Sequence, residues 1–596
     1  MSGLDLGVIG NCAISGLVDA RGRIVWSCLP RFDGDPVFHA LLGSPDPNDR
    51  DIGAFTVHLE GFTRAEQEYD PNTAILRTRL FGSDGDALEI TDFAPRFRTR
   101  GRMFRPMMIV RRVRPIAGRP RVTFRIRPRF NWGGRAPEVT HGSNHIRYVS
   151  SGLVVRLTSN APVSYLLAET PFVVDEPVSF LIGPDETVRE GIETLARSFE
   201  EDTANYWREW SRRLAIPLEW QNAVIRAAIT LKLCTYEETG AIVAAMTTSI
   251  PEAADTERNW DYRYCWLRDA FFVVRALNSL AEVETMETYL RYLYNIVRET
   301  DGDHLQPVYG IGREAHLTER IVDQLPGYRG MGPVRVGNQA YEHFQHDVYG
   351  NVILGASQAF FDERLFRPAT LDDFHLLERV GERAFAMHAE PDAGMWELRT
   401  RARVHTSSSL MCWAACDRLA KIANRFGADE RTAYWRDRAN TVRTAIFEQG
   451  WNEKAGSFVE SFGGADIDAG LLLMAEVGFL APDDDRFVAT VDRIGRELKI
   501  GNHLHRYVAP DDFGRPRTAF NICTFWYIDA LARIGRTEEA REIFQTMLDA
   551  RNHLGLLSED VEPATGELWG NYPQTYSMVG IINGAVRLSR RWDTVT

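Results

Sequence analysis

The stretch "EWQNAVIRAAITLKLCTYEE", residues 219–238, marks the point where the pattern of the chain changes. From here onward apolar residues recur at spacings of three and four, which is the period of an amphipathic helix. Helix-length segments of this kind follow one another, and loops rich in Gly and Pro separate them. We therefore predict a helical domain over residues 219–596.

This helical half contains twelve candidate helices, and the sequence shows no convincing strand between them. Twelve helices form six hairpins, which either stack as an open solenoid or close into a toroid. A solenoid of repeats has a fixed sequence period, and none is present, so the pattern favours a closed toroid. The expected helices span 219–236, 267–281, 283–299, 342–361, 371–388, 405–425, 429–448, 466–478, 485–497, 518–534, 536–550 and 573–590.

Two long loops interrupt the helices, over residues 237–266 and 300–341, and both are rich in Trp, Tyr, Arg and Gly. Long ordered loops on a rigid scaffold are the usual carriers of binding groups. We expect these two loops to carry the functional site.

The preceding part of the chain has a two-residue period, most clearly in "PRVTFRIRPRF", residues 120–130. Residues from about 50 to 190 contain several such runs, and Gly82-Ser83-Asp84-Gly85 separates two of them as in a hairpin. This spacing predicts an antiparallel sandwich. The expected fold is thus multidomain β + α: a β-sandwich domain over 1–200, a linker helix region over 201–218 and the helical domain.

Charge and cysteine content limit the classes of partner. The 596 residues include 82 acidic and 69 basic ones, a formal charge of −13, and nucleic acid or an anionic membrane requires a basic face instead. No apolar run approaches the roughly 18 residues of a membrane span, and the N-terminal residues lack a secretory signal pattern. Seven cysteines without disulfide or zinc spacing indicate free thiols. We expect a cytoplasmic protein with a neutral small-molecule or sugar substrate, no cofactor and no metal.

Glu397 is the first candidate for chemistry. It lies in "DAGMWELR", residues 392–399, after Gly394 and directly behind Trp396. Either it is an isolated surface charge, or it lies in an apolar pocket where desolvation favours the protonated carboxyl. The apolar neighbours Met395 and Leu398 favour the second interpretation.

A second carboxylate, Glu559, follows Ser558 in the Gly- and Pro-rich stretch over 553–578. Two carboxyl groups in aromatic loops suit glycoside hydrolysis, which needs one protonated acid and one ionised base or nucleophile. Polar, glycine-rich neighbours predict an ionised Glu559 and apolar neighbours predict a protonated Glu397, a difference that would divide their roles. The alternative for Ser558-Glu559-Asp560 is a solvated helix cap.

The segment "RNWDYRYCWLRDAFF", residues 258–272, combines aromatic rings with Arg and Asp just before an apolar helix. Adjacent Arg268 and Asp269 offer donors and an acceptor that can hold sugar hydroxyls, and Tyr and Trp rings can stack on a sugar. The alternative is a helix cap with an ion pair.

Together these motifs resemble glycoside hydrolase family fifteen, the bacterial and archaeal glucoamylase/trehalase family. Trp266-Leu267-Arg268-Asp269, Trp396-Glu397 and Ser558-Glu559 occur in the order found in glucoamylases, and the resemblance covers nearly the whole chain. It extends to the opening "GVIGNCAISGLVDARGRIVWSCLPRFDGDPVF" and to residues 327–338, 346–350 and 570–577.

The resemblance implies a β-sandwich joined to an (α/α)6 barrel, with the active site in the barrel mouth. It also implies an inverting exo-hydrolase that releases β-glucose from the non-reducing end of a small neutral α-glucoside. The implied roles are general acid for Glu397, general base for Glu559, binding of the terminal glucose hydroxyls for Arg268 and Asp269, and pocket walls for Tyr262, Trp266 and Trp396.

Two departures concern the pocket beyond the cleaved bond. "GNQAYEHFQHDVYG" over 337–350 replaces a "GNAA" motif followed by a Gln-rich stretch, and Leu398-Arg399 follow the acid where fungal glucoamylases have a second acidic residue. Within the family the substrates are trehalose, α-1,4-linked oligosaccharides or starch ends, and α-1,6-linked glucans. A cytoplasmic location favours trehalose, with a glucoamylase-type 1,4-α-glucosidase as the alternative.

Other interpretations remain at this point. A phosphorylase shares such a scaffold but needs only the acid, so Glu559 counts against it, and a non-catalytic sugar-binding protein would not need both carboxylates. His343 and His346 form an i, i+3 pair on a predicted helix without a third metal ligand, which favours a structural role. Residues 25–36 either reach over the barrel mouth or pack at the domain interface, and a homo-oligomer is possible.

Overall fold

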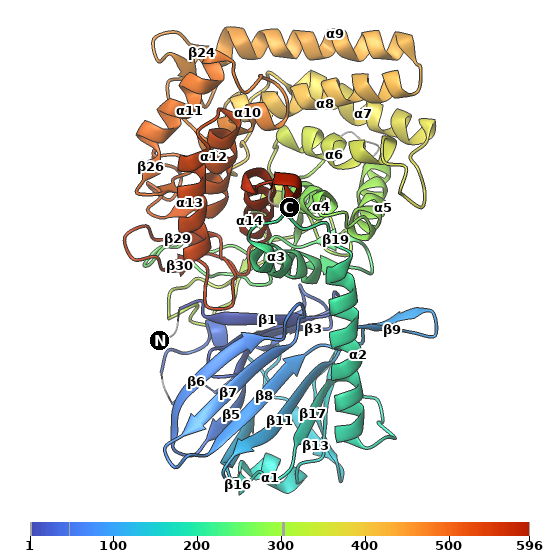
Figure 1. The fold of residues 1–596 in the computed structure, drawn as a ribbon, viewed down its shortest axis with the longest axis vertical. Coiled ribbons are helices and arrows are strands. Elements are labelled where there is room, and N and C mark those ends of the chain that lie inside the picture. Colours follow the sequence, from blue (N-terminus) through green and yellow to red (C-terminus); the bar gives the residue numbers. More distant parts are fainter. Residues whose placement is uncertain (1–2, 47, 50, 301–303, 595–596) are drawn as a thin grey trace.

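Alternating apolar and polar residues fold the first part of the chain into two packed antiparallel sheets, drawn in blue in Figure 1. In this computed structural model, which describes residues 3–46, 48–49, 51–300 and 304–594, Val122 and Phe124 are buried and lie opposite Leu59 and Val57. The hairpin predicted around Gly82–Gly85 is confirmed, because β7 (Leu76–Gly82) pairs with β8 (Ala87–Phe93) across it.

The two sheets have different strand orders. One has the order β1-β2-β3-β5-β12-β16, with β4 paired to β3, and the other has the order β13-β14-β15-β17-β11-β8-β7-β6. The first comprises β1 (Leu6–Gly10), β2 (Ser15–Asp19), β3 (Ile24–Leu29), β4 (Asp35–Phe38), β5 (Phe55–Leu59), β12 (Arg121–Ile126) and β16 (Phe172–Val173). The second comprises β6 (Phe62–Tyr69), β7 (Leu76–Gly82), β8 (Ala87–Phe93), β11 (Ile109–Ala117), β13 (Glu138–His141), β14 (His145–Val149), β15 (Val154–Ser159) and β17 (Val178–Gly183).

Strands begin earlier than the sequence pattern indicated. The alternating pattern was visible only from about residue 50, whereas β1, β2 and β3 lie within residues 6–29. Every residue of these three strands is buried. A strand buried on both faces has no two-residue alternation to detect.

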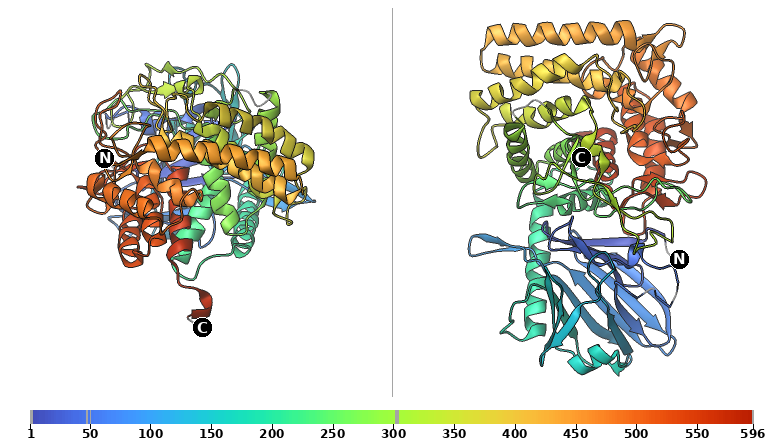
Figure 2. Two further views of the ribbon diagram at one scale, coloured as in Figure 1. Left: turned by 90° about the horizontal axis from the view of Figure 1, so that it is seen from above. Right: turned by 180° about the vertical axis from the view of Figure 1, so that it is seen from behind.

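A long helix, α2 (Ile192–Arg212), follows the sandwich and runs beside it towards the helical part of the molecule (Figures 1 and 2). It packs against β17, and its Glu193 and Glu200 form ion pairs with Arg112 of β11. This helix starts before residue 201, within the part assigned to the sandwich. We keep the proposed division into domains at residues 200 and 218.

The second part of the described chain contains twelve α-helices, as predicted, arranged as an (α/α)6 barrel. The inner helices are α4, α6, α8, α10, α12 and α14. Neighbours in this order pack against one another, except that α8 contacts the 3-10 turn Ala469–Leu472 leading into α10, and α14 closes the ring on α4. The twelve helices are α3 (Gln221–Leu233), α4 (Leu267–Ser279), α5 (Glu284–Glu299), α6 (Asp347–Ser357), α7 (Leu371–Met387), α8 (Thr406–Arg425), α9 (Asp429–Ala445), α10 (Leu473–Glu476), α11 (Asp485–Glu497), α12 (Asn521–Arg533), α13 (Thr537–Asp549) and α14 (Thr575–Leu588).

Burial separates the inner from the outer helices. Ten of the eleven residues of α6 are buried, whereas α5 and α11 bury one face and expose the other. A helix that is apolar all round belongs inside a core, and an amphipathic one belongs on its surface. No helix among the described residues is both long and apolar enough to cross a lipid bilayer.

Two expectations for the helical half were wrong in detail. The predicted helix 466–478 is a short 3-10 turn, Ala469–Leu472, that continues into the four-residue α10. The loops also contain two-residue strands, from β18 (Thr235–Tyr236) to β30 (Leu568–Trp569), where no strand was expected. Strands this short have no detectable period.

The sandwich and the barrel share one apolar core, which runs from β1–β3 into the barrel helices. At this interface the indole Nε1 of Trp26 donates to the Met246 carbonyl at 2.8 Å, and Nη1 of Arg263 donates to the Gly34 carbonyl at 2.8 Å. Residues 25–36 therefore pack at the domain interface and hold the barrel loop over 246–263.

Candidate active site

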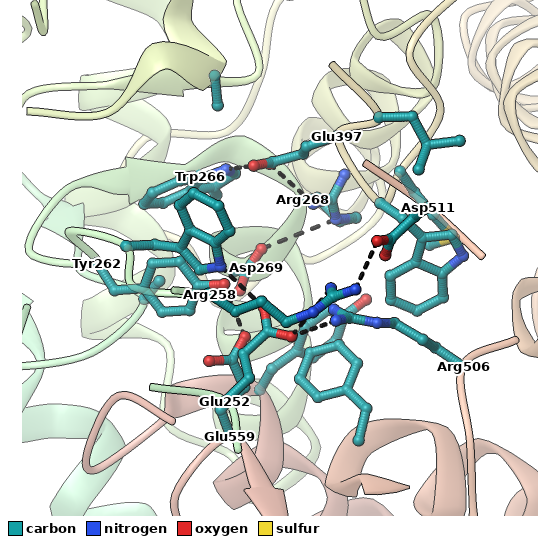
Figure 3. Close-up of a pocket in the computed structure, with 18 of the residues that line it drawn as sticks. Glu252, Arg258, Tyr262, Trp266, Arg268, Asp269, Glu397, Arg506, Asp511 and Glu559 are labelled. Atoms are coloured by element: carbon teal, nitrogen blue, oxygen red, sulfur yellow. Dashed lines mark hydrogen bonds and ion pairs between the residues drawn. The ribbon is translucent and has the colours of Figure 1, made fainter. Parts of the chain in front are cut away.

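The structure brings all seven sequence-predicted site residues into one pocket that is open to solvent (Figure 3). The seven come from three stretches far apart in the chain: Tyr262, Trp266, Arg268 and Asp269, then Trp396 and Glu397, then Glu559. Their assigned roles stay predictions.

Glu397 lies at the end of a tight glycine turn. Gly394 has a φ of +67°, and a Cβ there would lie 2.8 Å from the His405 ring, so only glycine fits. Glu397 itself has a φ of +60°, a left-handed conformation that is uncommon for a residue with a side chain. Strained residues of this kind cluster at functional sites, and here the turn directs the carboxylate into the pocket.

The surroundings of the Glu397 carboxylate differ from the apolar pocket that was predicted. The indole Nε1 of Trp266 donates a hydrogen bond to its Oε1 at 2.6 Å, and Nη2 of Arg268 lies 3.6 Å from the same oxygen. The side chain is 24% exposed. Met395 and Leu398, the apolar neighbours in sequence, also line the pocket. The prediction was wrong because the carboxylate itself faces an indole N–H and a guanidinium from a distant part of the sequence.

Trp396 is fixed by a residue that the sequence did not reveal. Its indole Nε1 donates to Oδ2 of Asp468 at 2.7 Å, and its ring packs edge-to-face on Phe520 at 5.7 Å between ring centres. Burial raises the pKa of Asp468 to about 7, and the nearby charge of Glu460 adds to this shift. Asp468 precedes a short 3-10 turn without any recognisable motif, so no sequence signal identified it.

Glu559 lies directly before β29 (Asp560–Val561) and is 1% exposed. The hydroxyl of Tyr262 donates to its Oε1 at 2.6 Å, whereas its Oε2 has no hydrogen-bond partner among the described residues. Burial raises the pKa of Glu559 to about 8; the negative charge of Glu252 also raises it, and Tyr262 and Arg506 oppose the shift.

The prediction that polar, glycine-rich neighbours keep Glu559 ionised was therefore wrong. Glycine in this loop permits close packing instead of hydration. Gly570 has a φ of +76°, and a Cβ there would lie 2.6 Å from the Glu559 Cβ and 2.8 Å from its Oε2. The loop thus packs directly against the carboxyl and keeps water from most of it.

We expect Gly570→Ala to lower turnover strongly, because the new methyl group displaces the Glu559 side chain. Gly566→Ala is the matched control: Gly566 lies in the same loop with a φ of +72°, but a Cβ there would meet nothing within 4 Å. Both variants should lose about 1–2 kcal/mol of stability from the left-handed backbone. Steady-state kinetics and thermal unfolding separate the two effects, and equal turnover in both variants would contradict the prediction.

Arg268 and Asp269 begin helix α4 at the floor of the pocket. Nη1 of Arg268 donates to Oε1 of Gln345 at 3.1 Å and to Oδ2 of Asp347 at 3.2 Å, which fixes the guanidinium. Burial raises the pKa of Asp269 to about 6, Glu397 adds to the shift and Arg268 opposes it. A fixed donor beside a buried acceptor can bind adjacent hydroxyl groups of a sugar ring.

A second charged cluster lines the other side of the pocket, and the sequence did not predict it. Glu252 is buried and accepts from Trp260 Nε1 at 2.8 Å and from the guanidinium of Arg506, while Arg258 Nη1 lies 3.6 Å away. Asp511 pairs with Arg258. Glu252 and Arg258 lie in the loop over 237–266 that was expected to carry the site, although only Arg258 belongs to a motif. Arg506 and Asp511 come from a loop that the sequence did not single out.

His343 and His346 do not share a helix, which corrects that expectation. His343 ends the 3-10 turn Gln339–Glu342, and His346 precedes helix α6. Among residues 3–46, 48–49, 51–300 and 304–594, no group of three or more His, Cys, Asp or Glu side chains is arranged to hold a metal ion. All seven cysteines are buried and free.

Two of the carboxyl groups that line the pocket, those of Glu397 and Glu559, each accept a hydrogen bond from an aromatic side chain. Trp266 donates to Glu397, Tyr262 donates to Glu559, and the two rings contact each other edge-to-face at 5.3 Å between centres. Two carboxyl groups that flank a bound sugar can act as the acid and the base of glycosidic bond cleavage.

Nearly the whole chain is similar to known glycoside hydrolases. Residues 220–586 match the model of Glycosyl hydrolases family 15, and residues 5–169 match that of the Trehalase-like, N-terminal domain. The trehalase of Thermoplasma volcanium is 30% identical over 98% of this chain and 93% of its own. The trehalase of Mycolicibacterium smegmatis is 31% identical over 98% and 91%, and that of Mycobacterium tuberculosis 31% over 96% and 88%.

A solved structure shows the same fold. The crystal structure of a bacterial glucoamylase complexed with acarbose covers 98% of this chain and 94% of its own, with a TM-score of 0.71 and 12% sequence identity. At this identity the likeness extends to the architecture of sandwich and barrel.

Proposed function

The chain belongs to glycosyl hydrolase family 15, and from this premise we propose that it is an inverting α-glucosidase whose substrate is trehalose. Relatives from both bacteria and archaea that are named trehalases match almost its entire length at about 30% identity. The observation that carries the proposal is the meeting of Glu397 and Glu559 in one pocket, each with a fixed hydrogen-bond donor.

In the proposed reaction, Glu397 acts as the general acid. Its carboxyl proton passes to the glycosidic oxygen as the bond from C1 of the terminal glucose to that oxygen breaks. Trp266 and Arg268 both face Oε1 of Glu397, so they stabilise the carboxylate that remains after proton transfer.

Glu559 acts as the general base. A water molecule attacks C1 from the face opposite the leaving group, and the Glu559 carboxylate accepts the water proton. Tyr262 holds the other carboxylate oxygen. An inverting enzyme needs roughly 6.5–9.5 Å between its two carboxyl groups to admit this water. The products from trehalose are one β-glucose and one α-glucose.

Arg268 and Asp269 bind the hydroxyl groups of the terminal glucose, and the rings of Tyr262, Trp266 and Trp396 form the walls around it. Hydrogen bonds made in a dry pocket are strengthened as the charge of the transition state develops. The buried position of Asp269 and the fixed guanidinium of Arg268 support these roles.

The alternatives are less well supported. A glucoamylase-type enzyme shares the architecture, but the full-length relatives named here are trehalases. A phosphorylase binds phosphate where an inverting hydrolase has its base, so the presence of a second carboxyl group, Glu559, in the pocket counts against this alternative. The seven free thiols support a reducing compartment, and a cytoplasmic location is part of the proposal.

The experiment that tests the function is glucose release from trehalose, maltose, maltotriose and isomaltose at matched concentrations, followed by proton NMR. We expect trehalose to be the preferred substrate and equal amounts of β- and α-glucose to appear first. Initial release of α-glucose alone would exclude the inverting scheme. Cleavage only after phosphate is added, with glucose phosphate as a product, would establish a phosphorylase instead.

A further inference from the structure

His405 is a buried histidine whose ring packs against the turn that carries Glu397. It is the last residue of the loop between α7 and α8, and it is 4% exposed. A Cβ on Gly394 would lie 2.8 Å from both Cδ2 and Nε2 of this ring, so the turn rests directly on the imidazole. His405 does not line the pocket and therefore makes no contact with a bound substrate.

Carboxyl groups lie on both sides of the imidazole. Its Nδ1 forms an ion pair with Glu460, and its Nε2 lies 4.0 Å from Oδ1 of Asp392. Neither Nε2 nor this Oδ1 has a hydrogen-bond partner among the described residues, so the contact between them is electrostatic. Burial disfavours a charge on the ring, but Glu460, Asp392 and Asp468 outweigh it and raise the pKa of His405 above its ordinary value.

Asp392 fixes the start of the turn. Its main chain exchanges two hydrogen bonds with Arg403, of 2.8 and 3.1 Å. Its Oδ2 accepts from the main-chain N–H of His346 and from the hydroxyl of Ser408, both at 2.7 Å. Asp392 is 2% exposed, and a protonated His405 supplies the positive charge that a buried carboxylate needs.

Asp468 fixes the residue next to Glu397. It accepts from the indole of Trp396 at 2.7 Å and from the main-chain N–H of Gly470 at 2.6 Å. The charge of His405 favours the ionised form of Asp468, against the effect of burial. An ionised carboxylate is the stronger acceptor for the indole. His405 thus acts on both ends of the turn.

We propose that His405 is a positioning residue for Glu397: held between Glu460 and Asp392, its ring supports the turn over 392–397 and keeps the Glu397 carboxyl at its place in the pocket. The proposal rests on the proposed function, because it assumes that Glu397 takes part in the reaction. Misplacing a catalytic group by about 1 Å can cost 10²-fold in rate, so a residue outside the pocket can control turnover.

The test is a double-mutant cycle between His405→Asn and Glu397→Gln. Asparagine keeps an amide donor close to the position of Nδ1 and removes the ring atoms that meet Gly394. We expect His405→Asn to lower kcat on trehalose by about 10–100-fold with little change in KM. In the Glu397→Gln background the same substitution should change kcat by only about twofold, because the group that it misplaces is already inactive.

His39→Asn is the matched control. The His39 ring is also buried and packs against a glycine with a positive φ: Gly53, at +69°, where a Cβ would lie 2.7 Å from the ring. This contact is in the sandwich and does not line the pocket. His39→Asn should lower Tm and leave kcat unchanged, which separates positioning from a general loss of stability.

Gly394→Ala and Gly53→Ala form a second pair that leaves every charge in place. Only Gly394→Ala should lower kcat, and it should lose this effect in the Glu397→Gln background. It replaces His405→Asn in the cycle if that variant does not fold.

Two results would overturn the proposal: a wild-type kcat in folded His405→Asn, or an equal fold-loss in kcat with and without the Glu397 carboxyl. Failure of the proposed function is seen separately. Wild-type turnover in Glu397→Gln alone would remove both the acid and its positioning residue. If the wild type cleaves maltose and not trehalose, the proposed substrate is wrong, and the same cycle measured on maltose decides the role of His405.

Discussion

Glu397→Gln should lower kcat on trehalose by about 10²–10⁴-fold, the usual contribution of a general acid or base. Glutamine preserves the size of the side chain and an oxygen that accepts from Trp266, so the pocket keeps its shape while the transferable proton is lost. Steady-state kinetics with purified protein measure the effect. Glu390→Gln, which alters an exposed glutamate outside the pocket, is the control.

The same variant should retain most of its activity on α-glucosyl fluoride. Fluoride leaves without protonation, so a substrate of this kind does not need the acid. A comparable loss on both substrates would assign Glu397 a different role, because only an acid is bypassed by a better leaving group.

Glu559→Gln should lose about 10²–10⁴-fold in kcat on both trehalose and α-glucosyl fluoride, since each reaction needs an activated water. The two variants should therefore differ in their activity on α-glucosyl fluoride. This difference shows which carboxyl is the base and which is the acid from measurements on this protein alone. Glu562→Gln, three residues along and outside the pocket, is the matched control. The opposite result is activity on α-glucosyl fluoride that survives in Glu559→Gln and disappears in Glu397→Gln. It would make Glu559 the general acid and Glu397 the general base.

The raised pKa of Glu559 adds a second measurement to the same variant. Between its ordinary value of 4.5 and its folded value of about 8, this carboxyl binds more protons in the folded than in the unfolded chain. Stability from this group therefore falls as pH rises through that interval. Removing the group should raise Tm relative to wild type at pH 8 and have less effect at pH 5. In the wild type, kcat/KM should rise across the same interval as Glu559 ionises.

The periodic spacing of apolar residues was sufficient to predict most of the helices and the presence of a β-sandwich. Amphipathic helices such as α5, α7 and α11 were predicted within one or two residues, because half of each helix faces solvent and half faces the core. The elements that the sequence pattern did not predict were either buried on every side, such as β1–β3, or only a few residues long, such as α10. Neither kind produces a pattern of alternating burial.

Motifs and a family resemblance predicted which residues line the site. They did not predict the surroundings of the two carboxyl groups. Glu397 was expected in an apolar pocket and Glu559 in a hydrated loop, because the judgement rested on neighbours in sequence. In the structure Glu397 faces Trp266 and Arg268, whereas Glu559 is enclosed by Tyr262 and the Gly570 turn. Side chains brought in from distant loops form the surroundings of each carboxyl.

The bonds from Trp26 and Gly34 to the loop over 246–263 have a consequence for biosynthesis. N-terminal domains emerge first from the ribosome and fold as units, so the sheet edge that supports this loop is in place before the loop is made. The carboxylate at position 559 is synthesised almost last, from a segment whose Asn552 side chain donates back to the carbonyls of Leu4 and Leu6 at 3.0 Å. The first strand to emerge is thus already folded when the last part of the active site docks against it. A chain that ends before residue 559 lacks both this carboxylate and α14, the helix that closes the ring of inner helices.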